Sequence, residues 1–464
     1  MSKPSIPSGT RDFSPAVVRK RQYIFNILRN IFELYGFQPL ETPAMENLVT
    51  LTGKYGEEGD RLIFKILNNG LHTITKESEK EKLATEWEKV LSKAYSSPTV
   101  TERALRYDLT IPFARYVVMN QNDLAFPFRR YQMQPVWRAD RPQAGRYREF
   151  WQCDADVVGS TSLMNEAELL CIYQAAFYEL KVPVTIKVNS RKLLAALAEL
   201  CGMPEKMMDI TIALDKLDKI GWDGVTKELT ERGISETGIS QIQNIINVTG
   251  DNDAKLNQLE ALMTNSPAGL EGIKELRTSL SYYGSLAKTE WTGSIDVDIS
   301  LARGLNYYTG VIVEVVCDSE KVRMGSIGGG GRYDDLTGLF GLKGLSGVGV
   351  SFGIDRIYDV MEQLGVFPDQ VATGTKAILL NFGGANEEYA LQILKQLRDA
   401  GIATELYPDS SKFDKQMKYA NKRGVTFVLL PGDEEREKGL ISVKNFSTGE
   451  QKMVSVADCI HMLQ

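Results

Sequence analysis

Histidine is nearly absent from this 464-residue sequence, which contains only His72 and His461. His72 lies in a polar segment and His461 lies close to the end of the sequence, so both side chains are expected at the surface. A Ser-His-Asp or Cys-His mechanism would depend on one of these two residues. Histidine-based catalysis and a histidine-rich metal site are therefore not expected, and no side chain is assigned as a metal ligand.

Paired cysteines and long apolar runs are also missing. The five cysteines are scattered and form no C-x-x-C pair, which argues against a disulfide framework or a cysteine zinc site. No segment approaches the ~20 consecutive apolar residues that a membrane helix needs, and residues 1–15 lack the apolar core of a secretory signal. These absences predict a protein of the reducing cytoplasm that does not enter a membrane.

Basic residues do not outnumber acidic ones, because the formal net charge is −6. This balance argues against a protein that coats DNA, although a nucleic acid can still bind where the local field is positive. The apolar content of 43% and the charged content of 25% are typical of globular proteins, and a chain of this length predicts two to four domains.

What the sequence does contain is a dense run of arginine. Six arginines lie between Arg129 and Arg148, with aromatic residues among them, and only Asp140 and the adjoining Glu149 are acidic. The planar guanidinium group matches phosphate oxygens, so this density favours a polyphosphate or nucleic-acid site. A solvated hairpin whose arginines pair with surface carboxylates would explain two or three arginines better than six. The alternation in residues 146–156 predicts a strand with one buried face and one face that lines the site.

Periodicity along the chain predicts a mixed α/β protein. Residues 19–35 have helical spacing and end at Gly36, a plausible C-cap. Residues 163–180 predict an amphipathic helix, and the charge-rich residues 70–97 predict an exposed helical insertion or a mobile loop. Residues 348–364 have the pattern of a strand that runs into a helix.

Changes in composition divide the chain into four parts. Residues 1–188 and 291–367 carry strand patterns and form one domain, which is interrupted by residues 189–290, where helix-forming segments alternate with polar turns. Residues 375–464 follow a linker and show a βαβαβ pattern of the size of a small independent α/β domain. We therefore expect a helical insertion within the first domain and a separate C-terminal domain.

Four consecutive glycines, Gly328–Gly331, precede Arg332 and Tyr333. Glycine lets the backbone approach a ligand closely, but such a run is more often a loop than a phosphate cradle. The segment does not match the P-loop pattern, since no lysine follows. A glycine-rich turn is therefore predicted here.

Two further segments place arginine and tyrosine beside predicted strands. Arg303 precedes a strand and is followed by Tyr307 and Tyr308. Adjacent residues of a strand face opposite ways, so one tyrosine is expected in the core and the other in a cavity, although two packing tyrosines at a strand start are equally compatible. Arg356 lies one turn into a predicted helix, where a surface ion pair is the simpler interpretation of that segment alone.

Taken in order, these segments resemble known motifs. ETPAMENL, VWRADRP with GRYREFWQCDAD, and GVSFGIDRI resemble the three signature motifs of class II aminoacyl-tRNA synthetases, and ARGLNYYTG and GGGGRYDDL resemble the two histidine-pocket motifs of the histidyl-tRNA synthetase family. The resemblance covers most of the chain. It implies an α/β fold with an α+β core: a catalytic domain on an antiparallel sheet, a helical insertion and a C-terminal α/β anticodon-binding domain.

The resemblance also implies roles for individual residues. Arg138 resembles the arginine on the α-phosphate of ATP, and Arg303 resembles the one at the junction of the amino-acid carboxylate and the α-phosphate, so these two are the expected catalytic residues. Arg146 resembles the arginine that reaches the terminal phosphates, and Arg356 resembles the arginine that clamps ATP. The expected histidine-binding residues are Asp108, Thr110, Gln152, Asp156, Tyr307, Tyr308 and Tyr333.

Three positions depart from the common pattern of the family. Asn306 stands where aspartate is usual, so a supporting hydrogen bond accepted by that carboxylate is not expected. Asp140 and Asp108 stand where glutamate is usual in many members. Because aspartate has the shorter side chain, its carboxylate would reach less far toward a ligand. None of the three removes a residue that the expected chemistry requires.

The implied activity is histidine–tRNA ligation. L-histidine and ATP with Mg²⁺ would form histidyl-adenylate, and the acyl group would then pass to the 3′ end of tRNA(His). A homodimer through residues 37–48 is implied, with no DNA or membrane partner. Lys415, Lys418 and Lys422 share one face of a predicted C-terminal helix, which suits contact with the tRNA backbone, although a solvated face explains these charges on their own.

Two other functions remain open from the sequence. The histidine-sensing regulatory subunit of ATP phosphoribosyltransferase has the same core, but it lacks the anticodon-binding domain and tends to lose the ATP arginines, which are present here. A class II synthetase specific for threonine, proline or glycine is opposed by the two tyrosine-bearing motifs.

Overall fold

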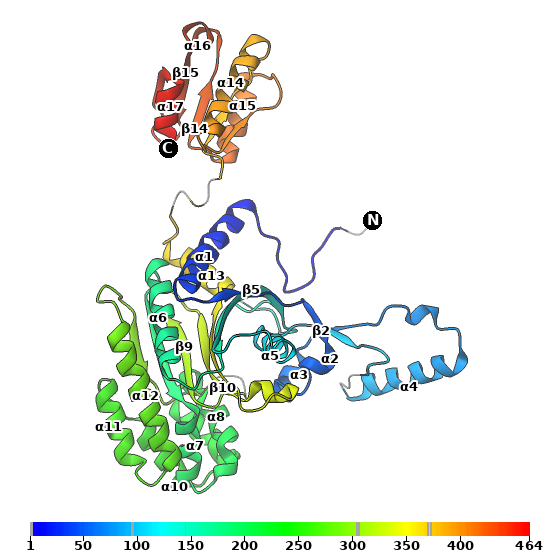
Figure 1. Cartoon of the computed structure of the whole chain (residues 1–464), viewed down its shortest axis with the longest axis vertical. Helices are drawn as coiled ribbons and strands as arrows, with labels where there is room; N and C mark the ends of the chain where they lie inside the picture. Colours follow the sequence, from blue (N-terminus) through cyan, green and yellow to red (C-terminus); the bar gives the residue numbers. More distant parts are fainter. Residues whose placement is uncertain (1–2, 94–96, 144, 303–306, 369–370, 372–373) are drawn as a thin grey trace. The chain divides into compact units, whose positions relative to one another are not determined.

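The computed structural model describes residues 3–93, 97–143, 145–302, 307–368, 371 and 374–464 (Figure 1). The chain forms two compact units. The first comprises the N-terminal residues up to Asp12 together with Ile24–Val366, and the second comprises Phe13–Tyr23 together with Phe367–Gln464. Helix α1, Pro15–Leu34, contributes residues to both units.

An eight-stranded sheet forms the centre of the first unit. In order across the sheet, the strands are β1 Gln38–Pro39, β5 Phe128–Trp137, β6 Glu149–Val158, β11 Ser346–Gly353, β10 Gly328–Asp334, β9 Val311–Cys317, β7 Val184–Ser190 and β8 Ser294–Val297. The pairings from β5 through to β7 are antiparallel, and the outer pairs β1–β5 and β7–β8 are parallel. The antiparallel sheet expected for the core is therefore confirmed.

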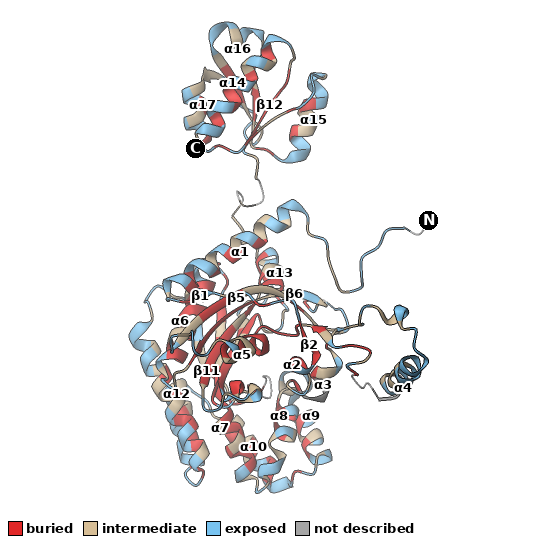
Figure 2. Ribbon diagram, turned by 45° about the vertical axis from the view of Figure 1, so that its right-hand side comes forward, coloured by how far each residue is buried: buried red, intermediate tan, exposed pale blue. Residues whose placement is uncertain are grey.

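One face of this sheet packs on α6, Met164–Glu179, and forms the core. Phe352 of β11 is fully buried against Tyr173 and Phe177, with ring centroids 4.6 and 5.7 Å away. Figure 2 shows buried residues along the strands of the first unit and on helices such as α5, α6 and α7. The helix expected for residues 163–180 is confirmed as α6, but its expected amphipathic character is not, because buried residues follow one another along most of it.

Helices replace strands between β7 and β8. They are α7 Arg191–Leu200, α8 Met207–Leu214, α9 Leu217–Glu231, α10 Glu236–Ile246, α11 Asn252–Leu262 and α12 Pro267–Leu286. The side chain of Ser190 accepts a hydrogen bond from Lys192 N at 3.2 Å and caps α7. Since Ser190 still belongs to β7, the helical segment begins at Arg191 rather than at residue 189.

Shorter elements connect β1 to β5. A three-stranded sheet contains β2 Met45–Asn47, β4 Arg103–Leu105 and β3 Lys65–Ile66, and the helices are α2 Leu48–Leu51, α3 Gly56–Arg61, α4 Glu77–Lys93 and α5 Thr110–Met119. Helix α4 projects away from this small sheet (Figure 1), and most of its described residues are exposed. The exposed helical insertion predicted within residues 70–97 is therefore confirmed for the part that the structure describes.

Two glycine predictions have opposite outcomes. Helix α1 ends at Leu34 and Gly36 has a φ of +77°, so the predicted C-terminal glycine is confirmed. The turn predicted at Gly328–Gly331 was wrong, because these residues form the first part of β10 in the middle of the sheet. The strand-to-helix pattern of residues 348–364 is confirmed by β11 and α13, Ile354–Leu364.

The second unit contains a five-stranded sheet. Its strands are, in order, β13 Thr404–Leu406, β12 Ala377–Leu379, β14 Phe427–Leu430, β15 Leu440–Asn445 and β16 Gln451–Ser455. Its helices are α14 Ala385–Asp399, α15 Phe413–Arg423, α16 Asp433–Lys438 and α17 Val456–Leu463. Strand β12 pairs in parallel with both β13 and β14, which confirms the βαβαβ prediction, and β15, β16 and α17 extend it.

Candidate active site

Alternation along β5 and β6 places two rows of polar residues on the sheet face opposite α6, which we call the site face. The β6 row is Gln152, Asp154 and Asp156, and the β5 row is Gln134, Gln132 and Arg130, paired in that order. Cys153 lies on the other face, where it pairs with the core residue Phe352. The two-faced strand predicted within residues 146–156 is thus observed as Glu149–Val158.

Glycine on neighbouring strands makes room above the site face. Gly349 of β11 lies in register with Asp156, and a Cβ at this position would stand 1.9 Å from Asp156 Oδ1. Gly347 lies opposite Tyr333 of β10, and a Cβ there would stand 2.3 Å from the tyrosine ring. The side chains of Asp156 and Tyr333 therefore occupy space that only glycine at these two positions leaves open.

Asp156, Arg130 and Tyr333 form a buried triad. Arg130 Nη2 lies 2.8 Å from Asp156 Oδ2, and the Tyr333 hydroxyl donates to Oδ1 at 2.6 Å. Burial raises the pKa of Asp156, and the charge of Arg130 opposes that rise. Burial also raises the pKa of Tyr333 well above its ordinary value, so the hydroxyl retains the proton that it donates.

A second carboxylate, Asp108, lies just before α5. Its Oδ1 accepts hydrogen bonds from the Tyr55 hydroxyl at 2.9 Å and from Ile111 N at 3.2 Å. Its Oδ2 is buried and has no hydrogen-bond partner among the described residues, and burial raises the pKa of the group. Thr110, the first residue of α5, forms a hydrogen bond with Tyr307. A buried acceptor without a partner is a place where a ligand donor can bind.

Tyr307 and Tyr308 lie before β9 and do not follow strand alternation. Both are half-buried, their rings are 5.0 Å apart in a T-shaped contact, and both pack on the apolar cluster that includes Tyr333. The prediction of one core tyrosine and one cavity tyrosine was therefore wrong, because alternation applies only within the strand.

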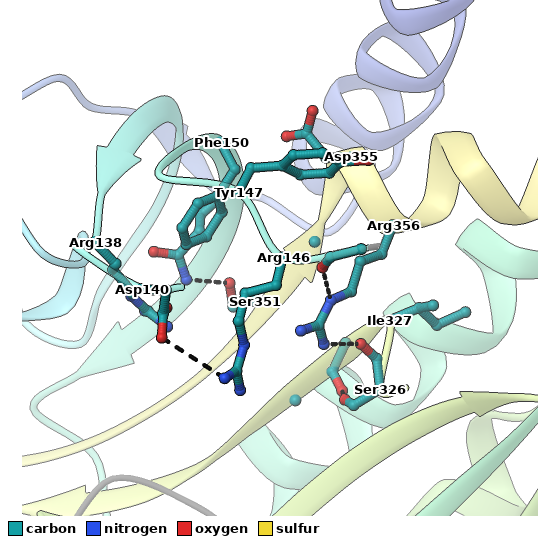
Figure 3. A pocket seen from close by; sticks show the side chains of 15 residues that line it. Arg138, Asp140, Arg146, Tyr147, Phe150, Ser326, Ile327, Ser351, Asp355 and Arg356 are labelled. Carbon is teal, nitrogen blue, oxygen red and sulfur yellow. Dashed lines mark hydrogen bonds and ion pairs between the residues drawn. The ribbon is translucent and has the colours of Figure 1, made fainter. Parts of the chain in front are cut away.

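A cavity of about 290 Å³ opens at the Gln152 end of the site face (Figure 3). Three of the predicted arginines line it, namely Arg138, Arg146 and Arg356. Its floor includes Gly328 and Gly329 of β10, so the glycine run does border a cavity although it forms a strand. The cavity therefore brings together the cationic side chains that the dense arginine run and the later helix supply separately.

Arg138 is anchored at the wall of this cavity. Its Nε donates to Tyr107 O at 3.1 Å, and the guanidinium carbon lies 4.3 Å from the centre of the Tyr107 ring and 5.2 Å from that of Phe150. Stacking and one hydrogen bond fix the plane of the group. Its two Nη groups form no hydrogen bond with any residue that the structure describes, so an anion in the cavity can bind them.

Arg146 and Arg356 border the cavity in different ways. Arg146 is half-exposed and its Nη1 lies 3.7 Å from Asp140 Oδ1. Arg356 donates from Nε to Gly145 O at 2.8 Å and from Nη1 to Ser326 O at 2.6 Å (Figure 3). Arg356 thereby joins the loop between β5 and β6 to the segment that precedes β10, whereas Arg146 can move toward a ligand.

The N-terminal segment also reaches this cavity, which no pattern in the sequence indicated. Arg11 forms an ion pair with Asp355, and its guanidinium carbon lies 3.3 Å from the centre of the Tyr147 ring. Asp355 and Tyr147 both line the cavity, and Asp355 also accepts a hydrogen bond from Trp151 N at 2.9 Å. Arg11 therefore connects the β5–β6 loop with the first turn of α13.

Other arginines of the dense run do not line the cavity. Arg129 forms an ion pair with Glu168 at 2.6 Å. Arg148 donates from Nε to Asp140 O at 3.1 Å, and Arg141 is exposed. With Arg130 in the buried triad, the run divides between arginines that line the cavity and arginines that pair elsewhere or lie at the surface.

The structure places most predicted site residues in two adjoining groups. The inner group contains Asp108, Thr110, Asp156 and Tyr333, which are buried, and the half-buried Tyr307 and Tyr308, and the cavity group contains Arg138, Arg146, Gln152 and Arg356. Arg303 and Asn306 lie outside the described residues. Residues that the sequence did not single out are Arg11, Tyr55, Arg130, Asp154 and Ser351. The two-residue alternation from Gln152 to Asp156 was a usable signal for Asp154.

Across the parts of the chain that the structure describes, no group of three or more His, Cys, Asp or Glu side chains is arranged to hold a metal ion. In the same parts, no helix combines the length and apolar character that crossing a bilayer requires. His72 and His461 are both exposed, as the sequence predicted.

Comparison with known proteins gives consistent matches. The family model described as histidyl-tRNA synthetase matches residues 81–357, and the one described as anticodon binding domain matches residues 376–464. The histidine–tRNA ligase of Christiangramia forsetii is 53% identical, over 97% of this chain and 96% of its own length, and that of Bacteroides fragilis is 50% identical, over 100% and 99%. The crystal structure of histidyl-tRNA synthetase from Nostoc has a TM-score of 0.82 at 28% identity, covering 100% of this chain and 99% of that one.

These matches extend over the sheet, the helical insertion and the second unit, so they concern the whole arrangement and not one motif. They agree with the family that the order of the motifs indicated. The chain belongs to the histidyl-tRNA synthetase family of class II aminoacyl-tRNA synthetases.

Proposed function

We propose that this chain ligates L-histidine to the 3′ end of tRNA(His) in two steps. Histidine and ATP form histidyl-adenylate and pyrophosphate, and a ribose hydroxyl at the 3′ end of the tRNA then takes the histidyl group as the anhydride bond breaks and AMP leaves. The observation that carries this proposal is the juxtaposition of the buried triad, which suits a ring with polar nitrogens, and the arginine-lined cavity, which suits a triphosphate.

The first step depends on alignment and charge stabilisation, since it needs no protein nucleophile. A carboxylate oxygen of histidine attacks the α-phosphorus of ATP in line, the P–O bond to pyrophosphate breaks, and pyrophosphate leaves. Arg138, fixed by Tyr107 and Phe150, would bind the α-phosphate and stabilise the negative charge that develops there. Arg146 and Arg356 would bind the terminal phosphates.

Arg303 completes the proposed adenylation site. We assign it to the junction of the histidine carboxylate and the α-phosphate on the family resemblance alone. A cation at that junction lowers the repulsion between two anionic reactants and adds charge stabilisation in the transition state. Arg303 and Arg138 are therefore the proposed catalytic residues.

Histidine selection is proposed to rest on hydrogen bonds. Asp156 would accept from one imidazole nitrogen, while Tyr333 and Tyr308 border the ring. The α-ammonium group would lie near Thr110 and against the oxygens of Asp108 and Gln152 that have no partner among the described residues. A site built on such bonds rejects amino acids that lack the matching groups more strongly than apolar contact does.

Mg²⁺ is proposed to enter with ATP as part of the nucleotide substrate. This ion usually keeps several waters and binds through substrate phosphates and one or two carboxylates. Asp140 and Asp355 line the cavity, but Arg146 lies close to the first and Arg11 pairs with the second. This set fits an ion held mainly by phosphate oxygens rather than by a protein cage.

The division of the chain into functional parts stays a proposal. We assign residues 1–188 and 291–367 to the catalytic domain and residues 189–290 to a domain inserted in it. We assign residues 375–464 to anticodon binding.

The proposed tRNA contact rests on α15. Lys415, Lys418 and Lys422 are exposed, whereas Gln416 and Ala420 of the same helix are buried. The three cations are therefore directed to solvent, where a phosphate backbone can reach them.

A homodimer through residues 37–48 is proposed from exposed apolar side chains in and beside that region. Leu34, Met45 and Val49 have 80%, 51% and 72% of their surface exposed. Apolar residues this exposed and this close in sequence are typical of a protein interface. We also propose a cytoplasmic location, where ATP, tRNA and free cysteines such as those of this chain occur together.

The regulatory alternative has less support. A crystal structure from Bacillus halodurans, titled as an ATP phosphoribosyltransferase regulatory subunit/histidyl-tRNA synthetase, shares the fold with a TM-score of 0.71, but it is only 20% identical. The relatives near 50% identity are named histidine–tRNA ligases. The cavity also retains Arg138, Arg146 and Arg356.

ATP–pyrophosphate exchange across a panel of amino acids tests the proposed activity. We expect exchange that depends on histidine and is absent with threonine, proline and glycine. A protein that binds histidine without any exchange would favour the regulatory function, and exchange with another amino acid would overturn the proposed specificity.

A further inference from the structure

Asp154 is a buried carboxylate that the proposed reaction does not yet use. It lies on the site face between Gln152 and Asp156, with only 3% of its surface exposed. Its Oδ1 has no hydrogen-bond partner among the described residues. Burial of a charged group in this way costs free energy unless the group is paired or hydrogen-bonded.

Ser351 connects Asp154 with Gln152. It lies in register with Asp154 on the adjacent strand β11, and a hydrogen bond joins the two side chains. Ser351 Oγ also accepts a hydrogen bond from Gln152 Nε2 at 3.0 Å. The hydroxyl thus lies between a carboxylate and an amide, and it has a single proton to donate.

The location of that proton fixes the orientation of the Gln152 amide. An ionised carboxylate can only accept, so the Ser351 proton is directed to Asp154. The Ser351 oxygen must then accept from Gln152, which requires the nitrogen end of the amide to face Ser351. The opposite end, Oε1, is left buried and without a partner among the described residues.

We propose that Asp154 is a positioning residue that acts through Ser351 to direct the oxygen of Gln152 toward the α-ammonium group of histidine. This inference rests on the proposed place of the ammonium group beside Gln152. If the amide were reversed, its NH₂ group would face the ammonium, and two donors cannot form a hydrogen bond with each other.

The charges around Asp154 are consistent with this role. Burial raises its pKa to about 7, and the positive charge of Arg130 on β5 opposes the rise. Two other carboxylates, Asp156 on β6 and Asp108 before α5, favour protonation. An ammonium group bound nearby adds positive charge to this acidic group and favours the ionised form on which the orientation depends.

The test compares two ligands that differ only at the ammonium group. The dissociation constants of L-histidine and of 3-(imidazol-4-yl)propanoate, which lacks the α-amino group, are measured by calorimetry on the full chain. Asp154→Val removes the acceptor with a residue suited to a strand, and Ser351→Ala removes the link. We expect each variant to weaken histidine binding about tenfold and to leave binding of the deamino analogue within about twofold.

A double variant distinguishes an effect of Asp154 through Ser351 from a general effect on folding. Because Asp154 is proposed to act only through Ser351, Asp154→Val should cause no further loss of histidine affinity in a Ser351→Ala background. In exchange assays the KM for histidine should rise in each variant, while the KM for ATP stays unchanged in Asp154→Val, because Asp154 does not line the cavity assigned to ATP.

The outcomes distinguish this inference from the proposed function. Equal losses for both ligands, additive losses in the double variant, or unchanged histidine affinity would each overturn the role of Asp154. If the unaltered protein itself bound both ligands equally well, the proposed ammonium site beside Gln152 would also be wrong. Retained histidine-dependent exchange in that case would leave the ligase activity itself intact.

Discussion

Tyr333 and Asp156 are joined by a 2.6 Å hydrogen bond that crosses Gly349, a position where a Cβ would stand 1.9 Å from the same carboxylate oxygen. The backbone of β11 thus sets how closely the two side chains can approach. Since Arg130 holds the other carboxylate oxygen, the acceptor of the proposed imidazole site is fixed before histidine binds. Such preorganisation lowers the cost of binding and sharpens selection.

Removal of the Tyr333 hydroxyl should weaken histidine binding specifically. In Tyr333→Phe, Asp156 loses a donor and its position is held by Arg130 alone. We expect the KM for histidine in ATP–pyrophosphate exchange to rise about tenfold, with the KM for ATP within about twofold of its original value. An equal rise in both constants would contradict a role confined to the histidine site.

Gly349→Ala should displace Asp156 and abolish most histidine-dependent exchange. The added Cβ cannot fit beside the carboxylate, so either the side chain or the strand must shift. Gly284→Ala is the matched control, because nothing lies within 4 Å of a Cβ at that helical position. The control should retain full exchange activity and stability, and comparable activity of the two variants would disprove the steric argument.

Arg11→Ala should raise the KM for ATP several-fold and leave the dissociation constant of histidine unchanged. The variant removes the ion pair with Asp355 and the contact with Tyr147, both at the cavity wall. Steady-state exchange at varied ATP measures the first effect, and calorimetry measures the second. A change in histidine affinity without a change in the KM for ATP would contradict the role of Arg11 at the ATP cavity.

Arg303→Ala should reduce the rate of adenylate formation far more than it reduces histidine binding. Its proposed place at the carboxylate–phosphate junction means that its charge matters most when the α-phosphate gains negative charge. Single-turnover adenylation and calorimetric binding of histidine give the two quantities. An unchanged adenylation rate would exclude the assigned role.

The stability of the protein should respond to Asp154 in a pH-dependent way. Its folded-state pKa is raised to about 7, whereas an aspartate in the unfolded chain titrates near ~4. The folded state therefore binds more protons between these values, and this carboxyl lowers the free energy of unfolding as pH rises toward 7. Asp154→Asn removes the charge, so it should stabilise the protein at pH 8 by on the order of 1 kcal/mol or more.

Denaturant unfolding at two pH values measures this effect. At about pH 3, below the unfolded-state pKa, the original carboxyl is protonated in both the folded and the unfolded chain and resembles the amide, so the difference between the two proteins should nearly vanish. A variant that is less stable than the original at pH 8 would show that the ionised carboxylate stabilises the fold.

Local patterns predicted the parts of the fold that depend on neighbouring residues. The end of α1 at Gly36 and the passage from β11 into α13 follow from helix capping and from periodicity within one segment. The strand at Gly328–Gly331 could not be predicted in this way. Its glycines form a strand because Val313 and Val350 lie on either side of Gly330 and pair with it across the sheet.

In the candidate site, too, contacts between residues far apart in the sequence could not be predicted. Motif order identified Arg138, Arg146 and Arg356, and the structure places all three at one cavity. Arg11 was missed because its contacts with Tyr147 and Asp355 join positions far apart in the sequence. Ser351 was missed because its relation to Asp154 depends on the register between β6 and β11, which no single segment encodes.

The segment that carries α4, residues 69–99, begins and ends beside the same paired residues of the three-stranded sheet. We call this segment the arm. Ile66 and Arg103 are paired across β3 and β4, and Asn68 N donates to Val100 O just beyond them. Because both ends of the arm are held at the width of a hairpin, the chain between them can lengthen or shorten without shifting a strand. This geometry makes residues 69–99 a natural point for evolutionary insertion and deletion, and a suitable attachment point for a reporter label.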